Sequence, residues 1–480
     1  MSEPGYSPRL RTALVLTGAG TSGAYHAGVL KALGEAGVKV DLVAGHGMGA
    51  VSAAFAAVDG ATKLHDAHGL WRHPALSRAY TWRTGLKIAG GALLIAAALI
   101  LSPLLLLGVT LAVYLVSLVL SLASMTDAAA ATTRAYHAML DAAIAPEALP
   151  TVMPRAVVLV LLVTVIALVG AWGVARRSAR ARRRGAFWQR VVGAPLSSGR
   201  LLDVVTLQLW ELVRGLVTAP RPAMPEFGRR YVELLTENLG QPGFRELLLT
   251  AHDVEARRDI SISLLSEPHR TAFHERRSDG QPREGETIDL TGIQRDAIVT
   301  ALEAALSVPL VTEPARLAYP ADSYWRGETH RVVDRPGCLL HLVDEAAAAG
   351  AEQAIIVSAA PPPAGPHQLR TINAGIAAQS GEVLRGIETA SLAEAERVAR
   401  ARFASCFVIR PPYNPIGPFD FGGTDDEASD RRMTLAELME RGYQDAYHQF
   451  IEPVVAVSGE KLGTGLNYFP SEDVPVSEPR

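Results

Sequence analysis

Cysteine, aromatic side chains and net charge are all scarce in this sequence. Of its 480 residues only Cys338 and Cys406 are cysteines, too few for a disulfide framework or a zinc site. Aromatic residues make up 6% of the chain, and the formal net charge is −3. This balance gives no global attraction to nucleic acid, and the sequence shows no sustained basic stripe with interleaved aromatic rings. We expect a reduced protein with no metal site, no cofactor and no nucleic-acid partner.

Two stretches lack charged residues altogether. Residues 88–126 form a run of 39 uncharged residues, and residues 156–175 form a run of 20. A helix of about 20 apolar residues crosses a membrane, so the second run fits one crossing. The first run is too long for one crossing and short for two, and Pro103 lies near its middle. We expect one long or tilted helix there, and spans at about 93–120 and 156–175; a buried core helix is the less favoured alternative.

The charges beside these runs predict their orientation. The segment 176–184, RRSARARRR, holds six arginines directly after the second run. Four further cations precede the first run: Arg72, Arg78, Arg83 and Lys87. Positively charged flanks stay in the cytoplasm, which places both ends inside and residues 127–155 outside. We expect a multi-pass protein of the cytoplasmic (inner) membrane whose soluble part faces the cytoplasm and whose partner is membrane lipid.

Strands and helices alternate in the soluble part. Residues 12–17, TALVLT, predict a strand, a helix follows up to Gly37, a second strand ends at Gly45, and a second helix begins near Ala50. Such alternation favours a parallel α/β sheet. Thr434 and Glu437 have the spacing of a capping box for a late helix. The predicted parts are 10–85, the insertion 86–184, 185–362 and a C-terminal α/β extension 363–480.

Two Gly-rich turns each join a predicted strand to a predicted helix. The first fits G-x-G-x-x-G over residues 18–23, and its backbone N–H groups could face an anion. Asp41 lies 18 residues beyond this turn, so dinucleotide binding is one alternative. However, the acid of that fingerprint ends its strand, whereas Asp41 begins one. The second turn fits the G-x-S-x-G frame of a nucleophile elbow with glycine in place of serine; its residues are Gly45, His46, Gly47, Met48 and Gly49.

The two turns together resemble those of the patatin-like phospholipases. The resemblance rests on LVLTGAGTSGAYHAGVLKAL, on DLVAGHGMGAVSAA and on a later series, ALEAALSVPLVTEP, SYWRGETHRVVDRPG and AGAEQAIIVSAAPP. It covers roughly 12–80 and 225–362. It implies a three-layer α/β/α, α/β-hydrolase-like domain that acts on lipids through a Ser–Asp dyad. It also implies an oxyanion loop, which corresponds here to Gly18, Gly20, Thr21, Ser22 and Gly23, with Ser22 in place of the usual arginine.

The chain differs from the family at the two catalytic positions. The serine of the dyad corresponds to Gly47, and its aspartate corresponds to Arg326, in Arg326-Gly327-Glu328. Two losses in one dyad predict a catalytically degenerate site, and glycine accepts the strained elbow backbone without a side-chain penalty. We therefore expect a membrane-embedded homologue, not an enzyme, that binds lipid or a protein partner of unknown identity at the old site.

Two other functions stay open. A lipid acyl hydrolase with a different arrangement could use His46 or His330 as base, with Glu328 or Asp334 as a partner or Glu328 itself as base. A nucleotide-binding membrane protein could use the turn at residues 18–23.

Overall fold

The chain forms two compact units. In the computed structural model, one unit comprises Met1–Thr81 and Ser198–Arg480, and the other comprises Trp82–Ser197. The structure describes residues 5–144, 152–178, 194–275, 283–309, 311–363, 365, 376–426 and 430–455. Each unit is described by itself below.

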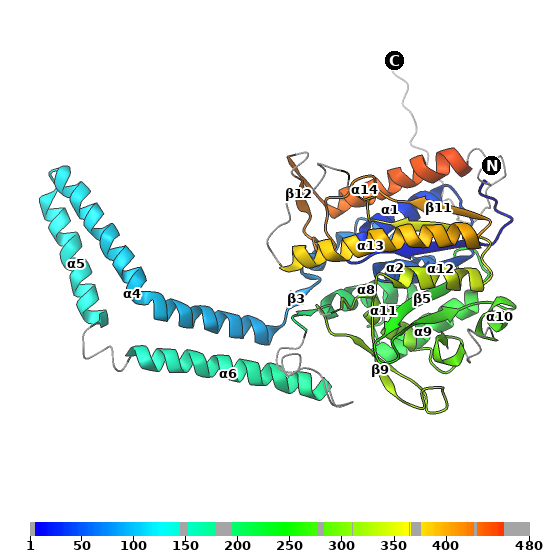
Figure 1. The fold of residues 1–480 in the computed structure, drawn as a ribbon, viewed down its shortest axis with the longest axis horizontal. Helices are drawn as coiled ribbons and strands as arrows, with labels where there is room; N and C mark the ends of the chain where they lie inside the picture. The colour runs from blue at the N-terminus through cyan, green and yellow to red at the C-terminus, as the bar shows by residue number, and fades with distance from the viewer. Residues whose placement is uncertain are drawn as a thin grey trace, which may run out of the picture. The chain divides into compact units, whose positions relative to one another are not determined.

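A central, mostly parallel sheet organises the first unit (Figure 1). Its strand order is β11-β10-β1-β2-β5-β6-β7, and β9 pairs with β5 and β8. Neighbours from β11 to β5 are parallel, and β6 and β9 run antiparallel to β5. The strands are β1 (Thr12–Thr17), β2 (Leu42–Gly45), β5 (Glu246–Asp253), β6 (Arg258–Leu264), β7 (Thr287–Asp289), β8 (Ala315–Ala318), β9 (Thr329–Val333), β10 (Gln353–Ser358) and β11 (Ser405–Ile409). The predicted α/β sheet is confirmed, and sequence on both sides of the insertion meets in it.

Helices cover both faces of the sheet. Alternate residues of β1 belong to different cores, Leu14 and Leu16 to one and Ala13 and Val15 to the other, because strand side chains alternate between faces. The first face carries α1 (Ser22–Glu35), α2 (Met48–Ala57), α8 (Gly199–Val213), α9 (Met224–Asn238), α11 (Ala297–Ala305) and α14 (Leu435–Ala446). The second face carries α10 (His269–Glu275), α12 (Cys338–Ala348) and α13 (Ile376–Arg402).

Short elements complete the described chain. The helices are α3 (Thr62–His65), η1 (Leu70–Arg72), η2 (Pro74–Arg78), η3 (Arg283–Gly285) and η4 (Tyr447–Val455). Two small ribbons pair β3 (Thr81–Trp82) with β4 (Leu196–Ser197), and β12 (Thr424–Asp426) with β13 (Arg431–Met433).

The predicted C-terminal extension is built into the first unit. Strand β11 joins the main sheet beside β10, and α14 packs against α1. The Tyr25 hydroxyl of α1 donates a hydrogen bond of 2.9 Å to the Asp445 carboxylate of α14. The predicted capping box is confirmed, since the side chains and backbones of Thr434 and Glu437 bond reciprocally at the start of α14. The last part of the chain therefore helps to build the domain rather than standing apart from it.

The described residues of the second unit include three long helices, α4 (Thr84–Leu122), α5 (Thr126–Ile144) and α6 (Val152–Ser178). Helix α4 is continuous but bent, with α6 along its first arm and α5 along its second (Figure 1). Pro103 lies midway along α4, and proline is a usual cause of such bends. The Tyr114 hydroxyl of α4 is 3.1 Å from Nε2 of His137 in α5. Residues 88–122 of the first uncharged run thus form one helix, as predicted, and residues 127–144 of the predicted exported loop are helical.

One helix in the described part of the chain is long and apolar enough to cross a membrane. It is the Leu105–Leu122 part of α4, with a mean hydropathy of 2.5 and no fully buried residue. Thr84–Ala98 of α4 and Arg155–Gly170 of α6 are apolar but shorter. Two crossings therefore remain a prediction. Most of the arginine run, residues 179–184, lies outside the described residues.

Candidate functional site

A glycine with a positive φ angle joins β2 to α2. Gly47 has φ 55° and ψ −139°, a left-handed backbone that an ordinary side chain rarely adopts. The flanking Gly49 is in close contact with the sheet, since a Cβ there would lie 1.9 Å from the Leu16 carbonyl oxygen. The backbone at residues 45–49 therefore makes the sharp strand-to-helix turn of a nucleophile elbow without a nucleophile.

Two groups crowd the place that a side chain at position 47 would occupy. A Cβ on Gly47 would lie 2.6 Å from the Gly18 carbonyl oxygen and 2.8 Å from Oδ2 of Asp334. Asp334 is buried and follows β9 directly. The carboxylate that faces the elbow is therefore that of Asp334.

The structure does not bring Arg326, the predicted counterpart of the family's acid, to the elbow. Arg326 lies in the exposed hairpin loop between β8 and β9, where its N–H donates to the Ser323 carbonyl. The sequence contains two turns in this region, Arg326-Gly327 and Asp334-Arg335. Only Arg326 is followed directly by a glycine, as the acid of the family's motif is. The strand between them carries Asp334, not Arg326, to the elbow.

A hydroxyl, an imidazole and a carboxylate form a buried series beneath the elbow. Nε2 of His46 is 2.6 Å from Oγ1 of Thr17, and its Nδ1 is 3.1 Å from Oδ1 of Asp334. With the proton on Nδ1, His46 donates to the carboxylate and accepts from the threonine, as in a catalytic triad. All three side chains are buried. His46 was one predicted candidate base and Asp334 one predicted candidate partner, whereas Thr17 was missed because it reads as an ordinary strand residue.

A second buried histidine lies beside this series. His26 of α1 contacts the Thr17 carbonyl through Nε2 (3.0 Å) and the Ser52 hydroxyl through Nδ1 (3.2 Å). Burial lowers the pKa of His26 to about 4, the hydrogen bond that its ring donates to the Thr17 carbonyl opposes this, and nearby His46 adds to the lowering. His26 is therefore neutral, and Ser52 sits in a closed polar core rather than at the tip of the elbow.

Several backbone N–H groups of the Gly-rich loop, residues 18–23, donate hydrogen bonds to acceptors within the chain. The Thr21 N–H donates to the Pro418 carbonyl (3.0 Å), and the Ser22 N–H donates to that of Ala19 (3.2 Å). The Met48 N–H, which follows the elbow residue, donates to the Gly18 carbonyl at 2.7 Å. An oxyanion hole needs such donors directed at the substrate. Here their acceptors are protein carbonyls.

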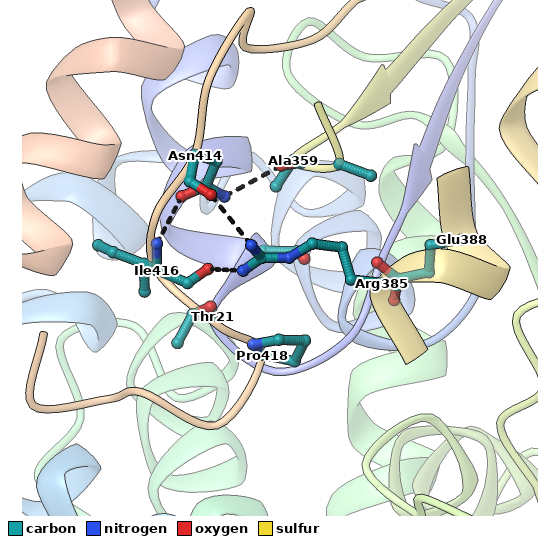
Figure 2. Close-up of a pocket in the computed structure, with 9 residues that line it drawn as sticks. Thr21, Ala359, Arg385, Glu388, Asn414, Ile416 and Pro418 are labelled. Atoms are coloured by element: carbon teal, nitrogen blue, oxygen red, sulfur yellow. Dashed lines mark hydrogen bonds between the residues drawn. The ribbon is translucent and has the colours of Figure 1, made fainter. Parts of the chain in front are cut away.

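A small cavity lies where the strand order reverses, beyond the carboxyl ends of β1 and β10. Ligands of open α/β sheets usually bind at such a point. This cavity measures about 10 Å³, room for roughly one water molecule. Thr21, Ser22, Ala359 and Ala360 line it, and the C-terminal part of the chain supplies the rest (Figure 2); these residues are Arg385, Glu388, Asn414, Ile416 and Pro418.

The other candidate bases form a separate group. Nδ1 of His330 is 2.6 Å from the Asp253 carboxylate, and its Nε2 is 3.3 Å from that of Glu328. The rings of Tyr319 and Trp325 contact the imidazole of His330. Both ring nitrogens thus have carboxylate partners within the β8–β9 hairpin and β5.

The nucleotide alternative finds little support in the positions of its residues. The carboxylate of Asp41 accepts the Thr12 N–H at the amino end of β1, at the opposite edge from the Gly-rich loop. It is therefore remote from where a ribose would bind. In the described parts of the chain, no three His, Cys, Asp or Glu side chains gather as metal ligands.

Comparison with known families agrees with this geometry. Residues 14–155 match the family model described as patatin-like phospholipase, and this range includes the Gly-rich loop and the elbow. This part of the chain is therefore similar to a patatin-like phospholipase domain. The match relates the patatin-like domain to a family of lipid hydrolases. No curated protein matches the chain.

Proposed function

We propose that this protein is a membrane-bound, non-catalytic member of the patatin-like group. The observation that carries the proposal is the contact of the Gly18 carbonyl with the elbow. It lies 2.6 Å from where a nucleophile's Cβ would be, and it accepts the Met48 N–H. Nucleophile and oxyanion donor, the two parts of acyl transfer, are thus both lacking at this turn.

Lipid contact is assigned to the helices of Trp82–Ser197. The cavity at the sheet is far smaller than the roughly 300 Å³ or more that small-molecule sites occupy. Helices α4 and α6, in contrast, expose long apolar surfaces, with Leu107 and Leu122 at 70% and 79% and Val158 at 63%. Exposed apolar surface of this extent is typical of a membrane or protein contact. The patatin-like domain then acts as a membrane-held scaffold or regulator.

We expect no labelling of the purified full-length protein by a fluorophosphonate probe, because the probe requires an activated serine. A panel of phospholipid and short-chain esters should likewise give no hydrolysis above a heat-denatured sample. A catalytically active serine hydrolase in the same detergent serves as the positive control. Labelling that disappears in Ser22→Ala or Ser52→Ala would contradict the proposal.

The Thr17–His46–Asp334 series favours one second candidate, a hydrolase with threonine as nucleophile. Its connectivity matches a catalytic triad, although all three groups are buried. Thr17→Val keeps the shape of the side chain and removes its hydroxyl. Ester hydrolysis by the wild type that is lost in both Thr17→Val and His46→Ala would select this candidate over the non-catalytic one.

We expect two membrane crossings, one by α4 and one by α6. Strands before and after the insertion pair in one sheet, so the number of crossings between them must be even. A cysteine at Met139, which is exposed in α5, should react with an impermeant maleimide in intact cells. One at the exposed Arg200 should react only after permeabilisation. The same accessibility at both positions would contradict this topology and indicate that α4 and α5 cross as a hairpin.

A further inference from the structure

Helix α13 places a carboxyl group against the Gly-rich loop. The Glu388 side chain is buried, with 6% of the residue exposed, and its Oε2 is 3.9 Å from where a Cβ on Gly18 would lie. The Ala19 backbone N–H donates a hydrogen bond to it. No part of the proposed function uses this group, yet it contacts the loop that the family resemblance assigns to a substrate carbonyl.

The surroundings of Glu388 favour its uncharged form. Burial raises the pKa of Glu388 to about 8, and the negative charge of Asp334 acts in the same direction. The Ala19 N–H and the positive charge of Arg385 oppose this rise. At neutral pH the group is therefore mostly a neutral carboxyl, whose C=O accepts a loop N–H as the carbonyl of an ester or fatty acid would.

A second contact from α13 holds the covering segment in place. Arg385, one turn before Glu388, donates hydrogen bonds to the carbonyl oxygens of Asn414 and Ile416 (Figure 2). That segment continues to Pro418, whose carbonyl accepts the Thr21 N–H. The C-terminal part of the chain thus covers the Gly-rich loop with residues 414–418 and also places the Glu388 side chain against it.

We propose that Glu388 is an internal ligand of the Gly-rich loop, a carboxyl group of the chain held where the carbonyl of an acyl compound would otherwise bind. The inference deepens the proposed function and rests on it, since a loop filled in this way cannot receive a substrate carbonyl. Small neutral carbonyl compounds are the ligand class that should replace the side chain when it is removed. Its test measures thermal stability rather than hydrolysis, so it can fail while the proposed function stands.

The test is chemical rescue of Glu388→Ala by acetamide. The substitution should lower the Tm of the full-length protein in detergent, because the Ala19 N–H loses its acceptor. Acetamide at high millimolar concentration should then raise the Tm of Glu388→Ala by at least about 2 °C through binding to the folded state. Glu394→Ala, an exposed glutamate of α13, is the matched control and should not respond. Equal acetamide responses in both variants, or none in Glu388→Ala, would overturn the proposal.

Glu388→Gln keeps the test decisive if the alanine variant does not fold. A carboxyl whose pKa rises from 4.5 unfolded to about 8 folded stabilises fully below pH 4.5, and this contribution is lost as pH rises toward 8. Asp334 and Arg385 are the charged groups that act on Glu388, and His46 contacts Asp334. The Tm of the wild type should therefore fall relative to Glu388→Gln between about pH 5 and pH 8. Parallel pH profiles of the two proteins would also overturn the proposal.

Discussion

Replacing Gly47 with serine is expected to give a less stable protein that still hydrolyses no ester. The new Cβ would lie 2.6 Å from the Gly18 carbonyl oxygen. The serine would also have to adopt the φ of 55° found at this position. Strain and overlap together should lower the free energy of unfolding by about 2–4 kcal/mol. The serine gains Asp334 as a neighbour, but the Met48 N–H stays bonded to Gly18, so no donor stabilises an oxyanion.

Gly47→Ala separates strain from chemistry in this experiment. It adds the same Cβ without a hydroxyl, so its unfolding free energy should match that of Gly47→Ser. Adding Arg326→Asp to Gly47→Ser should change nothing, because Arg326 lies in an exposed hairpin loop. Thermal unfolding and the ester panel measure both effects. Hydrolysis by Gly47→Ser alone would show that Asp334 serves as its base and that the Gly18 peptide can turn away.

Replacing Gly20 with alanine is expected to have the largest effect on stability. Gly20 has φ 55°, and a Cβ there would lie 1.7 Å from the Pro418 carbonyl oxygen. A backbone atom cannot move aside as a flexible side chain can, so residues 414–418 must lift from the Gly-rich loop. We expect a loss of more than about 3 kcal/mol, measured by thermal unfolding, with faster hydrogen exchange at the Thr21 amide.

Gly386→Ala is the matched control for this substitution. Gly386 lies in α13 with no atom within 4 Å of its Cβ position, so alanine there should stabilise by about 0.5–1 kcal/mol through helix propensity. A Gly20→Ala protein as stable as the wild type would mean that residues 414–418 do not rest on the Gly-rich loop in solution.

Much of the patatin-like frame can be predicted from local sequence. The strand Thr12–Thr17 and the capping box at Thr434 were both predicted, because strand patterning and capping chemistry act between near neighbours. The glycines at 45, 47 and 49 predicted a tight strand-to-helix turn for the same local reason. The resemblance to the patatin-like family rested on these turns, and the match over residues 14–155 supports it.

The acid at the elbow could not be placed in this way. Arg326 and Asp334 are eight positions apart, and each begins a turn that resembles a degenerate form of the motif that carries the family's acid. Which of them reaches Gly47 depends on the pairing of β9 with β5, a contact between residues about 80 positions apart. No local pattern encodes that register.

The sequence by itself determined the Gly-rich turns, the absence of a serine at position 47 and the long apolar helices, since each follows from residue type and spacing along the chain. Only the tertiary structure decided what fills the site around those turns. Asp334, Thr17 and Glu388 come from three separate elements, and the last lies 370 positions from Gly18. Their meeting depends on sheet order and on the packing of α13 against α12 and β11, because side chains so distant in sequence are brought together only by the whole fold.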